Sequence, residues 1–298
     1  MTSVVKRGVS SSKHLIEFIV VFIVGGFFIL GLFFANPQDN SGADFPPPPV
    51  WSRGILQSIK FGNDSTTESF DLLRRIGFSP SGILDVGAYK GMWARMAERS
   101  FPDAEMFLIE ASEDRRQDLM KTGMSYVIAM VGSKYETVDF YDIPGKRANS
   151  RFREQTEDFL SDIPVKKVTY PLDVLMEGMP AVQLMKIDVQ GGELEVLKGG
   201  KNILKEVEVI YISVPMMKIH KGSPLALEIL SYCKSIGFEL LNYVDGDARG
   251  QNDALVHIEL TLAKKESPLF SRITEGVMLQ EDILQQQSVE EDLEDRGA

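Results

Sequence analysis

Residues 83–91 read ILDVGAYKG, and this short stretch decides the fold. Its apolar start predicts a buried strand. Gly87 permits a tight turn close to a ligand, and Gly91 lets the next helix begin beside it. Asp85 can hold a cationic amine, and a helix N-terminus with Lys90 nearby suits a carboxylate. The stretch therefore favours a ligand with an amino acid moiety, and a tight strand–helix turn without a ligand is the alternative.

Strands and helices alternate along the chain outward from this stretch. Strands separated by helices imply right-handed crossovers and an α/β fold with a mostly parallel, doubly wound sheet. In such sheets ligands bind beyond the carboxyl ends of the strands. The hydrophobic pattern predicts strands over 82–86, 105–110, 125–131, 184–188, 207–214, 239–244 and 254–263, and helices over 65–76, 92–99, 192–198 and 224–236.

Glu110 ends the predicted strand 105–110, the next strand after the glycine turn. A carboxylate in this position can accept hydrogen bonds from both hydroxyls of a ribose. The pair of features favours a nucleoside ligand. A nicotinamide-dependent oxidoreductase is the weaker alternative, because its G-x-G-x-x-G pattern has Tyr89 and Met92 here in place of the second and third glycines.

Residues 186–199 read KIDVQGGELEVLKG and form the third motif. Asp188 ends a central predicted strand at the expected active face. Gly191 and Gly192 favour a loop that a ligand can approach closely. Glu193 lies in the first turn of a predicted helix. The structural alternatives are a loop hydrogen bond for Asp188 and an interaction with the helix dipole for Glu193.

The segments DVGAYKG, FLIEAS and KIDVQGGELEVLKGG resemble the FkbM-type methyltransferases, and the resemblance covers about residues 76–270. It implies a seven-stranded, Rossmann-like methyltransferase sheet with helices on both faces and S-adenosylmethionine as the cofactor. It also implies O-methylation of a sugar, a glycan or another hydroxylated natural product. The cofactor-binding residues expected on this basis are Asp85, Gly87, Ala88, Tyr89, Gly91, Glu110, Ala129, Met130 and Asp188.

An alkyl hydroxyl is a poor nucleophile and benefits from a general base. Asp188 is the first candidate for this base and Glu193 the second. His220 follows the predicted strand 207–214, in a loop where it could contact the acceptor, although an ordinary loop histidine is the alternative. No metal site is assigned, because the three histidines are scattered. A divalent cation held by Asp188 and another carboxylate remains an alternative.

The sequence departs from the family pattern at Ser213. Family members often carry a glutamate at this place, late in the strand that follows the signature motif. The departure permits a second hypothesis, a catalytically inactive module that binds S-adenosylmethionine or a partner and is attached to a membrane anchor.

Residues 18–35 carry no charged side chain, and with Leu15 the apolar run reaches the ~20 residues that a spanning helix needs. A cleaved signal peptide has a shorter apolar region, so residues 15–35 predict a transmembrane signal anchor that binds the lipid bilayer. Lysines and arginines precede the run, and none follows it until Arg53. The positive-inside rule then places residues 1–14 in the cytoplasm and the large domain across the membrane.

A lumenal domain, in the Golgi or endoplasmic reticulum if the source is a eukaryote, also fits the glycosylation triplet at 63–65. Residues 36–54 predict a stalk because of their four consecutive prolines. The methyltransferase-like domain is expected over 55–270 and an acidic, disordered tail over 271–298. The net charge of −11 argues against nucleic acid as a partner and leaves a small-molecule or glycan acceptor.

Overall fold

The computed structural model describes residues 18–24, 27–33, 45–54, 66–142, 149–155, 163–244 and 254–276. It divides the chain into two compact units, Met1–Pro48 and Pro49–Ala298. Three predicted features lie outside the described residues: the cytoplasmic segment 1–14, the glycosylation triplet 63–65, and residues 277–298 of the acidic tail.

The first unit contains two antiparallel strands, β1 (Phe18–Val24) and β2 (Phe27–Phe33). The sequence predicted a helix over 15–35, and the structure differs from that prediction. Both runs are rich in β-branched and aromatic residues, which favour strands, and two glycines separate them in the sequence. In the part of the chain that the structure describes, no helix is long and apolar enough to cross a membrane.

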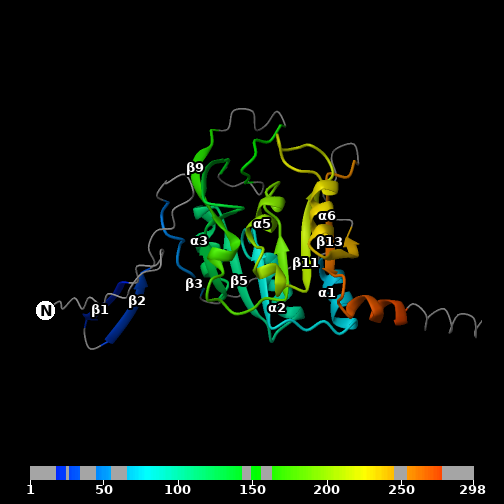
Figure 1. Cartoon of the computed structure of the whole chain (residues 1–298), viewed down its shortest axis with the longest axis horizontal. Coiled ribbons are helices and arrows are strands. Elements are labelled where there is room, and N and C mark those ends of the chain that lie inside the picture. The colour runs from blue at the N-terminus through cyan, green and yellow to red at the C-terminus, as the bar shows by residue number, and fades with distance from the viewer. Residues whose placement is uncertain are drawn as a thin grey trace, which may run out of the picture. The chain divides into compact units, whose positions relative to one another are not determined.

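The second unit is built on a mixed sheet of eight strands in the order β12-β13-β11-β10-β4-β5-β6-β3. Figure 1 labels β3, β5, β11 and β13 of this sheet. The five strands from β11 to β6 are parallel, whereas β13, β12 and β3 run antiparallel to their neighbours. Each of the seven predicted strands contributes a strand to this sheet, although the end of the strand predicted over 125–131 lies outside it, and β3 is the eighth strand. The bounds are β3 (Ser52–Arg53), β4 (Gly82–Val86), β5 (Glu105–Glu110), β6 (Ser125–Ile128), β10 (Leu184–Ile187), β11 (Val209–Pro215), β12 (Phe238–Val244) and β13 (His257–Lys264).

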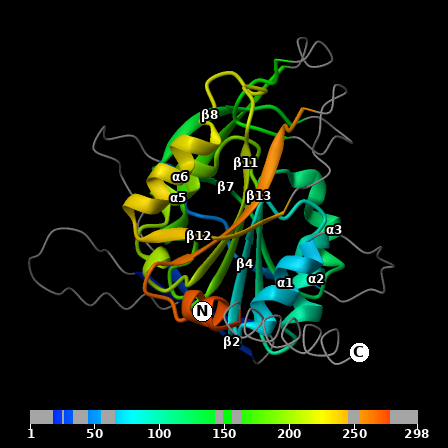
Figure 2. The same ribbon diagram turned by 90° about the vertical axis from the view of Figure 1, so that its right-hand side faces the viewer.

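Helices cover both faces of this sheet, as the doubly wound prediction requires. α1 and α2 lie on one face, and α5 and α6 lie on the other (Figure 2). The chain runs from β4 outward to β6, and later from β10 outward in the opposite direction, so the strand order reverses between β4 and β10. The helices are α1 (Thr66–Arg75), α2 (Met92–Ser100), α3 (Arg116–Met120), α4 (Leu172–Leu175), α5 (Glu193–Gly199) and α6 (Ala226–Ser235).

Two hydrophobic clusters fill the space between the sheet and its helices. Successive side chains of a strand point to opposite faces. In β11, Ile210 and Ile212 therefore join one cluster, while Val209 and Tyr211 join the other. Near-continuous apolar runs form these strands because both faces of the sheet are buried.

A second sheet has three strands, β7 (Met130–Gly132), β8 (Glu136–Phe140) and β9 (Val165–Pro171), in the order β7-β9-β8. The sequence predicted one strand over 125–131, but the structure divides it at Ala129. The backbone N–H of Ala129 still donates to the carbonyl of Glu110 in β5 at 2.9 Å, whereas the next residue, Met130, pairs with β9 of the second sheet. β8 and β9 were not predicted.

The folded domain begins before residue 55, where the predicted stalk ends. The indole Nε1 of Trp51 donates to the carbonyl of Leu175 at 2.9 Å. Its ring packs edge-on against Phe107 at 5.8 Å between centroids. Residues 51–54 therefore belong to the domain and not to a stalk.

The folded domain also extends past residue 270. Residues 271–276, which the sequence assigned to the tail, continue a helix that begins at residue 269. Nη1 of Arg272 donates to the carbonyl of Ile76 at 2.8 Å and so ties this helix to the end of α1.

Candidate active site

β4 and β10 are neighbours at the reversal of strand order, and the helices that follow them, α2 and α5, lie on opposite faces of the sheet. Open α/β sheets bind their ligands at such a place. Gly87 makes the turn after β4. Its backbone N–H donates to the carbonyl of Ile109 at 2.9 Å, and its φ is +84°. A Cβ at position 87 would lie 1.8 Å from the carbonyl oxygen of Asp188, so only glycine fits.

Glu110 lies at the end of β5, facing this turn. Its carboxylate accepts the backbone N–H groups of Tyr89 and Ser112, each at 2.8 Å. Burial raises the pKa of Glu110 above its ordinary value, and these two hydrogen bonds act in the opposite direction. A carboxylate oxygen has two lone pairs, so both oxygens of Glu110 can still accept a hydrogen bond from a ligand.

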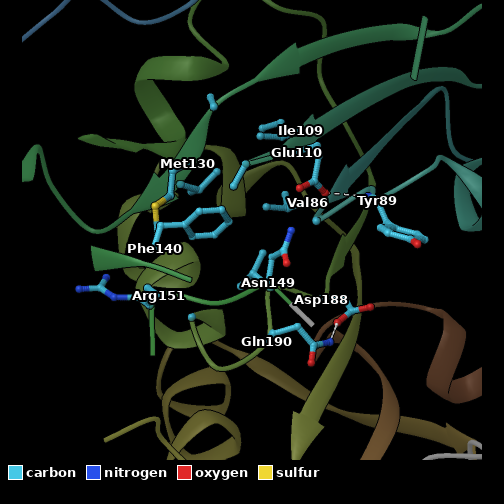
Figure 3. A pocket seen from close by; sticks show the side chains of 16 residues that line it. Val86, Tyr89, Ile109, Glu110, Met130, Phe140, Asn149, Arg151, Asp188 and Gln190 are labelled. Atoms are coloured by element: carbon cyan, nitrogen blue, oxygen red, sulfur yellow. Dashed lines mark hydrogen bonds between the residues drawn. The ribbon is translucent and has the colours of Figure 1, made fainter. Parts of the chain in front are cut away.

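A cleft of about 700 Å³ opens along these strand ends (Figure 3). This volume counts all the space between the lining residues, including space that is open to solvent. Glu110 and Asp188 lie on its walls, and Met130 and Phe140 give it an apolar part. Its lining residues are Val86, Gly87, Tyr89, Ile109, Glu110, Ala111, Ala129, Met130, Val131, Phe140, Asn149, Arg151, Asp188, Val189, Gln190 and Gly192.

Six of the nine predicted cofactor residues line this cleft, and three do not. Asp85 and Ala88 are buried beneath it, and Gly91 begins α2 with a φ of 75°. The residues that line it are Gly87, Tyr89, Glu110, Ala129, Met130 and Asp188.

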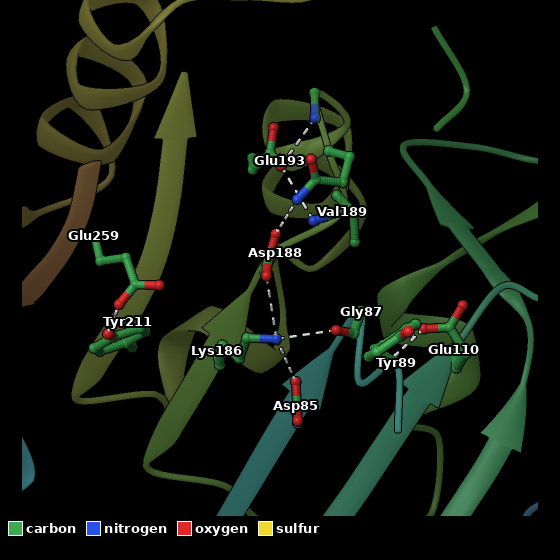
Figure 4. A network of polar contacts seen from close by, with 12 residues as sticks. Asp85, Gly87, Tyr89, Glu110, Lys186, Asp188, Val189, Glu193, Tyr211 and Glu259 are labelled. Atoms are coloured by element: carbon green, nitrogen blue, oxygen red, sulfur yellow. Dashed lines mark hydrogen bonds and ion pairs between the residues drawn. The ribbon is translucent and has the colours of Figure 1, made fainter. Parts of the chain in front are cut away.

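Lys186 explains why Asp85 does not reach the cleft. Its ammonium lies 3.0 Å from a carboxylate oxygen of Asp85 and donates to the carbonyl of Gly87 at 2.9 Å. It also lies 3.7 Å from Asp188 (Figure 4). Burial lowers the pKa of a lysine, but here the charges of Asp85 and Asp188 outweigh that effect and raise the pKa of Lys186. Lys186 therefore stays cationic and occupies the place that the sequence assigned to a ligand amine.

Asp188 follows the end of β10 and is accessible from the cleft, with 31% of its side chain exposed. One of its carboxylate oxygens accepts the side-chain amide of Gln190 at 2.7 Å, and the other faces Lys186. Two neighbours thus fix the direction of this carboxylate while solvent or a ligand can still reach it.

Glu193 is 1% exposed and does not line the cleft. Its Oε1 accepts the backbone N–H groups of Val189 at 3.1 Å and Gly191 at 3.0 Å. It thereby holds the loop of Gly191 and Gly192 in place. Gln190, in the same loop, has a φ of 55°. Burial raises the pKa of Glu193 to about 7.

His220 also lies away from the cleft lining and is 3% exposed. Burial, with a smaller contribution from His257, lowers its pKa to about 4. Its imidazole is therefore neutral at pH 7. Among the described residues, no group of three histidine, cysteine, aspartate or glutamate side chains could hold a metal ion.

Three polar residues of this region were not predicted as site residues from the sequence: Lys186, Asn149 and Arg151. The lysine was visible within the KID motif, but nothing in the sequence placed it beside Asp85. Asn149 and Arg151 belong to no periodic pattern in the sequence, although both line the cleft. The guanidinium of Arg151 is fixed by Glu136 at 3.0 Å.

A protein-family model, the methyltransferase FkbM domain, matches residues 85–240, which is more than half of the 298 residues. The chain belongs to the FkbM methyltransferase domain family. The match begins at Asp85 and includes both the glycine turn and the loop of Asp188. The FkbM domain thus contains the whole lining of the cleft, and S-adenosylmethionine is the cofactor that this family implies.

Solved structures of methyltransferases are similar to the FkbM chain at low sequence identity. A precorrin-6y C5,15-methyltransferase from Geobacter metallireducens is 10% identical over 71% of this chain and 94% of its own, with a TM-score of 0.39. A putative O-methyltransferase from Klebsiella pneumoniae is 13% identical over 70% of this chain and 83% of its own, with a TM-score of 0.40. No curated protein matches the chain.

Proposed function

We propose that the chain transfers the methyl group of S-adenosylmethionine to a hydroxyl group of a sugar, a glycan or another natural product. The observation that carries the proposal is the cleft itself. It has a buried carboxylate, Glu110, on one wall and an accessible carboxylate, Asp188, on another. The glycine turn after β4 lies between them, because β4 is the strand between β5 and β10.

The cleft fits S-adenosylmethionine by the chemistry of its lining. Glu110 suits the two ribose hydroxyls, as hydrogen-bond acceptors at this strand end commonly do. Ala129, Met130 and Phe140 offer an apolar surface for the adenine ring. The turn at Gly87 and Tyr89 lets a methionine moiety come close to the backbone.

The cofactor supplies an electrophilic methyl carbon on a sulfonium sulfur. When bound, it would supply this carbon to the acceptor oxygen, and its carbon–sulfur bond would break to leave a neutral thioether. The proton of the hydroxyl moves to the carboxylate of Asp188, which Gln190 and Lys186 hold in place. Holding the acceptor in line with the breaking bond can account for much of the rate.

Binding of S-adenosylmethionine to the full chain tests the first step. The cofactor at 100 times its dissociation constant should add about 2.7 kcal/mol to the free energy of unfolding. Glu110→Ala should weaken binding, whereas Glu206→Ala, an exposed residue before β11, should leave it unchanged. A folded chain without a thermal shift at saturating cofactor contradicts the proposal.

A second hypothesis, cofactor binding without transfer, is favoured by Ser213 alone. This residue stands where relatives often carry a glutamate, and it is 9% exposed at the carboxyl end of β11. Cofactor binding together with no methyl transfer to any hydroxylated acceptor would support this hypothesis against the first.

Membrane attachment through the N-terminal segment is a separate proposal. Its support is the composition of residues 18–35, which carry no charge, and the basic residues that precede them. A lumenal position of the domain is part of the same proposal.

A further inference from the structure

Five positions lie in one row across the carboxyl edge of the large sheet. β5 pairs with β4, β4 with β10, and β10 with β11. In each of these strands, the last residue that is paired in these registers directly precedes the residue that belongs to the row. On β13, a residue lies directly opposite the row's position on β11. In order across the sheet, the row consists of Glu110, Gly87, Asp188, Ser213 and Glu259.

Glu259 closes this row on the side away from Glu110. Directly opposed residues of antiparallel strands share a face, so the side chains of Ser213 and Glu259 lie on the same face of the sheet. Tyr211, two residues before Ser213, is on that face too, and its hydroxyl donates to the carboxylate of Glu259. Figure 4 shows Glu259 and Tyr211 on one side of Asp188, and Glu110 on the other.

Only the first three residues of this row line the cofactor cleft. Glu110, Gly87 and Asp188 line the cleft, whereas Ser213 and Glu259 do not. Neighbouring strands are about 4.8 Å apart, so two strand steps put the backbones of Asp188 and Glu259 about 10 Å apart. Side chains at such positions can contact opposite sides of one small molecule.

Two histidine rings with unsatisfied polar atoms lie near the end of the row that Ser213 and Glu259 form. His257 begins β13, two residues from Glu259, and the charge of Asp188 raises its pKa against the larger lowering by burial. His220 is buried, and its pKa in turn feels His257. Among the described residues, Nε2 of both rings is buried without a hydrogen-bond partner. Buried polar atoms of this kind are usually satisfied by a ligand or water.

We propose that Glu259, held by Tyr211, binds the methyl acceptor, and that the acceptor is an uncharged polyol lying between Asp188 and Glu259. This inference rests on the proposed methyl transfer and names its substrate class. Carboxylates accept hydrogen bonds from hydroxyl groups, and two of them repel an anionic acceptor.

The test uses the full chain, saturated with S-adenosylhomocysteine, and methyl glycosides as probes. One probe is a mixture of neutral methyl hexopyranosides, and the other is the anionic methyl glucuronide. Binding is measured by saturation-transfer NMR for the wild type, Glu259→Gln and Tyr211→Phe. Glu206→Gln is the matched control, because Glu206 is exposed and precedes β11 at the other edge of the sheet.

Glu259→Gln should weaken the binding of the neutral glycosides about tenfold, because the amide keeps one acceptor oxygen but loses the negative charge and the second acceptor. Tyr211→Phe should weaken glycoside binding by a smaller factor, because it removes the hydroxyl that holds the carboxylate of Glu259 but leaves the carboxylate itself. Both variants should keep the wild-type affinity for S-adenosylhomocysteine. If Glu259→Gln does not fold, Tyr211→Phe carries the test alone.

Equal glycoside binding by the wild type and the variants overturns the role of Glu259. Binding of the glucuronide as tightly as the neutral probes overturns the substrate class. A wild-type chain that binds S-adenosylhomocysteine but no glycoside overturns the inference and leaves the cofactor role intact. A chain that does not bind S-adenosylhomocysteine contradicts the proposed function itself.

Discussion

Gly87 and Asp188 meet through their backbones, so closely that a Cβ on residue 87 would lie 1.8 Å from the carbonyl oxygen of Asp188. The glycine turn after β4 and the loop after β10 are therefore one packed unit. A change in either segment must move the other, and the cleft that both segments line moves with them.

Gly87→Ala tests this contact. The side chain would strain a φ of +84° and collide with backbone, so we expect a loss of more than about 4 kcal/mol in the free energy of unfolding, and loss of cofactor binding. Gly178→Ala is the matched control, because Gly178 has a φ of +75° but no atom within 4 Å of its added Cβ. The control should lose only about 1–2 kcal/mol. Urea denaturation measures both, and equal losses would show that the contact is unimportant.

Asp188→Asn should separate catalysis from cofactor binding. Asparagine keeps the size of the side chain and an oxygen that can accept the amide of Gln190, but it cannot take up a proton. If Asp188 is the base, turnover should fall about 10²–10⁴-fold while the affinity for S-adenosylmethionine stays nearly constant. Turnover is measured with radiolabelled cofactor and the neutral glycosides, with the exposed Asp103→Asn as the control. Near-normal turnover would exclude base catalysis by Asp188.

Glu193→Gln should change how stability depends on pH. Burial raises the pKa of Glu193 from 4.5 to about 7, so between these values the folded chain holds a proton that the unfolded chain releases. Its contribution to the free energy of unfolding should fall by up to about 1.4 kcal/mol per pH unit in this window and stay level above it.

His220 acts in the opposite direction between pH 4 and 6.5, because its pKa is lowered from 6.5 to about 4. The wild type and Glu193→Gln must therefore be compared with each other at each pH. Their difference in unfolding free energy should shift in favour of the variant as the pH rises from 4.5 to 7. A difference that is constant with pH would contradict the assignment.

The full chain should sediment with membranes and resist extraction at alkaline pH if the N-terminal segment attaches it to a bilayer. A chain that begins at residue 45 should stay in the supernatant, since the uncharged residues 18–35 are then missing. The released domain should still bind S-adenosylmethionine. Complete release of the full chain by salt or alkali would contradict membrane attachment.

The central strands were predictable because each is a short apolar run next to a glycine or an acidic residue. β8 and β9 were not, since their sequences, ETVDF and VKKVTYP, mix charged and apolar residues and bury little of their surface. They are defined by the pairing of β9 with β8 on one side and with β7 on the other. Such long-range pairing is invisible to a reading of local periodicity.

At the site, Glu110 and Asp188 were predicted correctly as strand-end residues, but Lys186 was not recognised. A lysine near a strand end is usually solvated, and its burial here depends on Asp85, which lies 101 residues earlier in the chain. Glu259 was missed for the same reason, because its place in the row comes from the antiparallel pairing of β13 with β11.

The contacts of Trp51 bear on how this protein is produced for crystallisation and binding studies. A shortened chain that starts at residue 55, where the sequence alone sets the domain boundary, would lack both the indole that binds the carbonyl of Leu175 and the ring that covers Phe107. Leu175 is buried in the complete domain. Without Trp51 the apolar surface around it would be exposed, and exposed apolar surface favours aggregation. A shortened chain should therefore begin before Trp51.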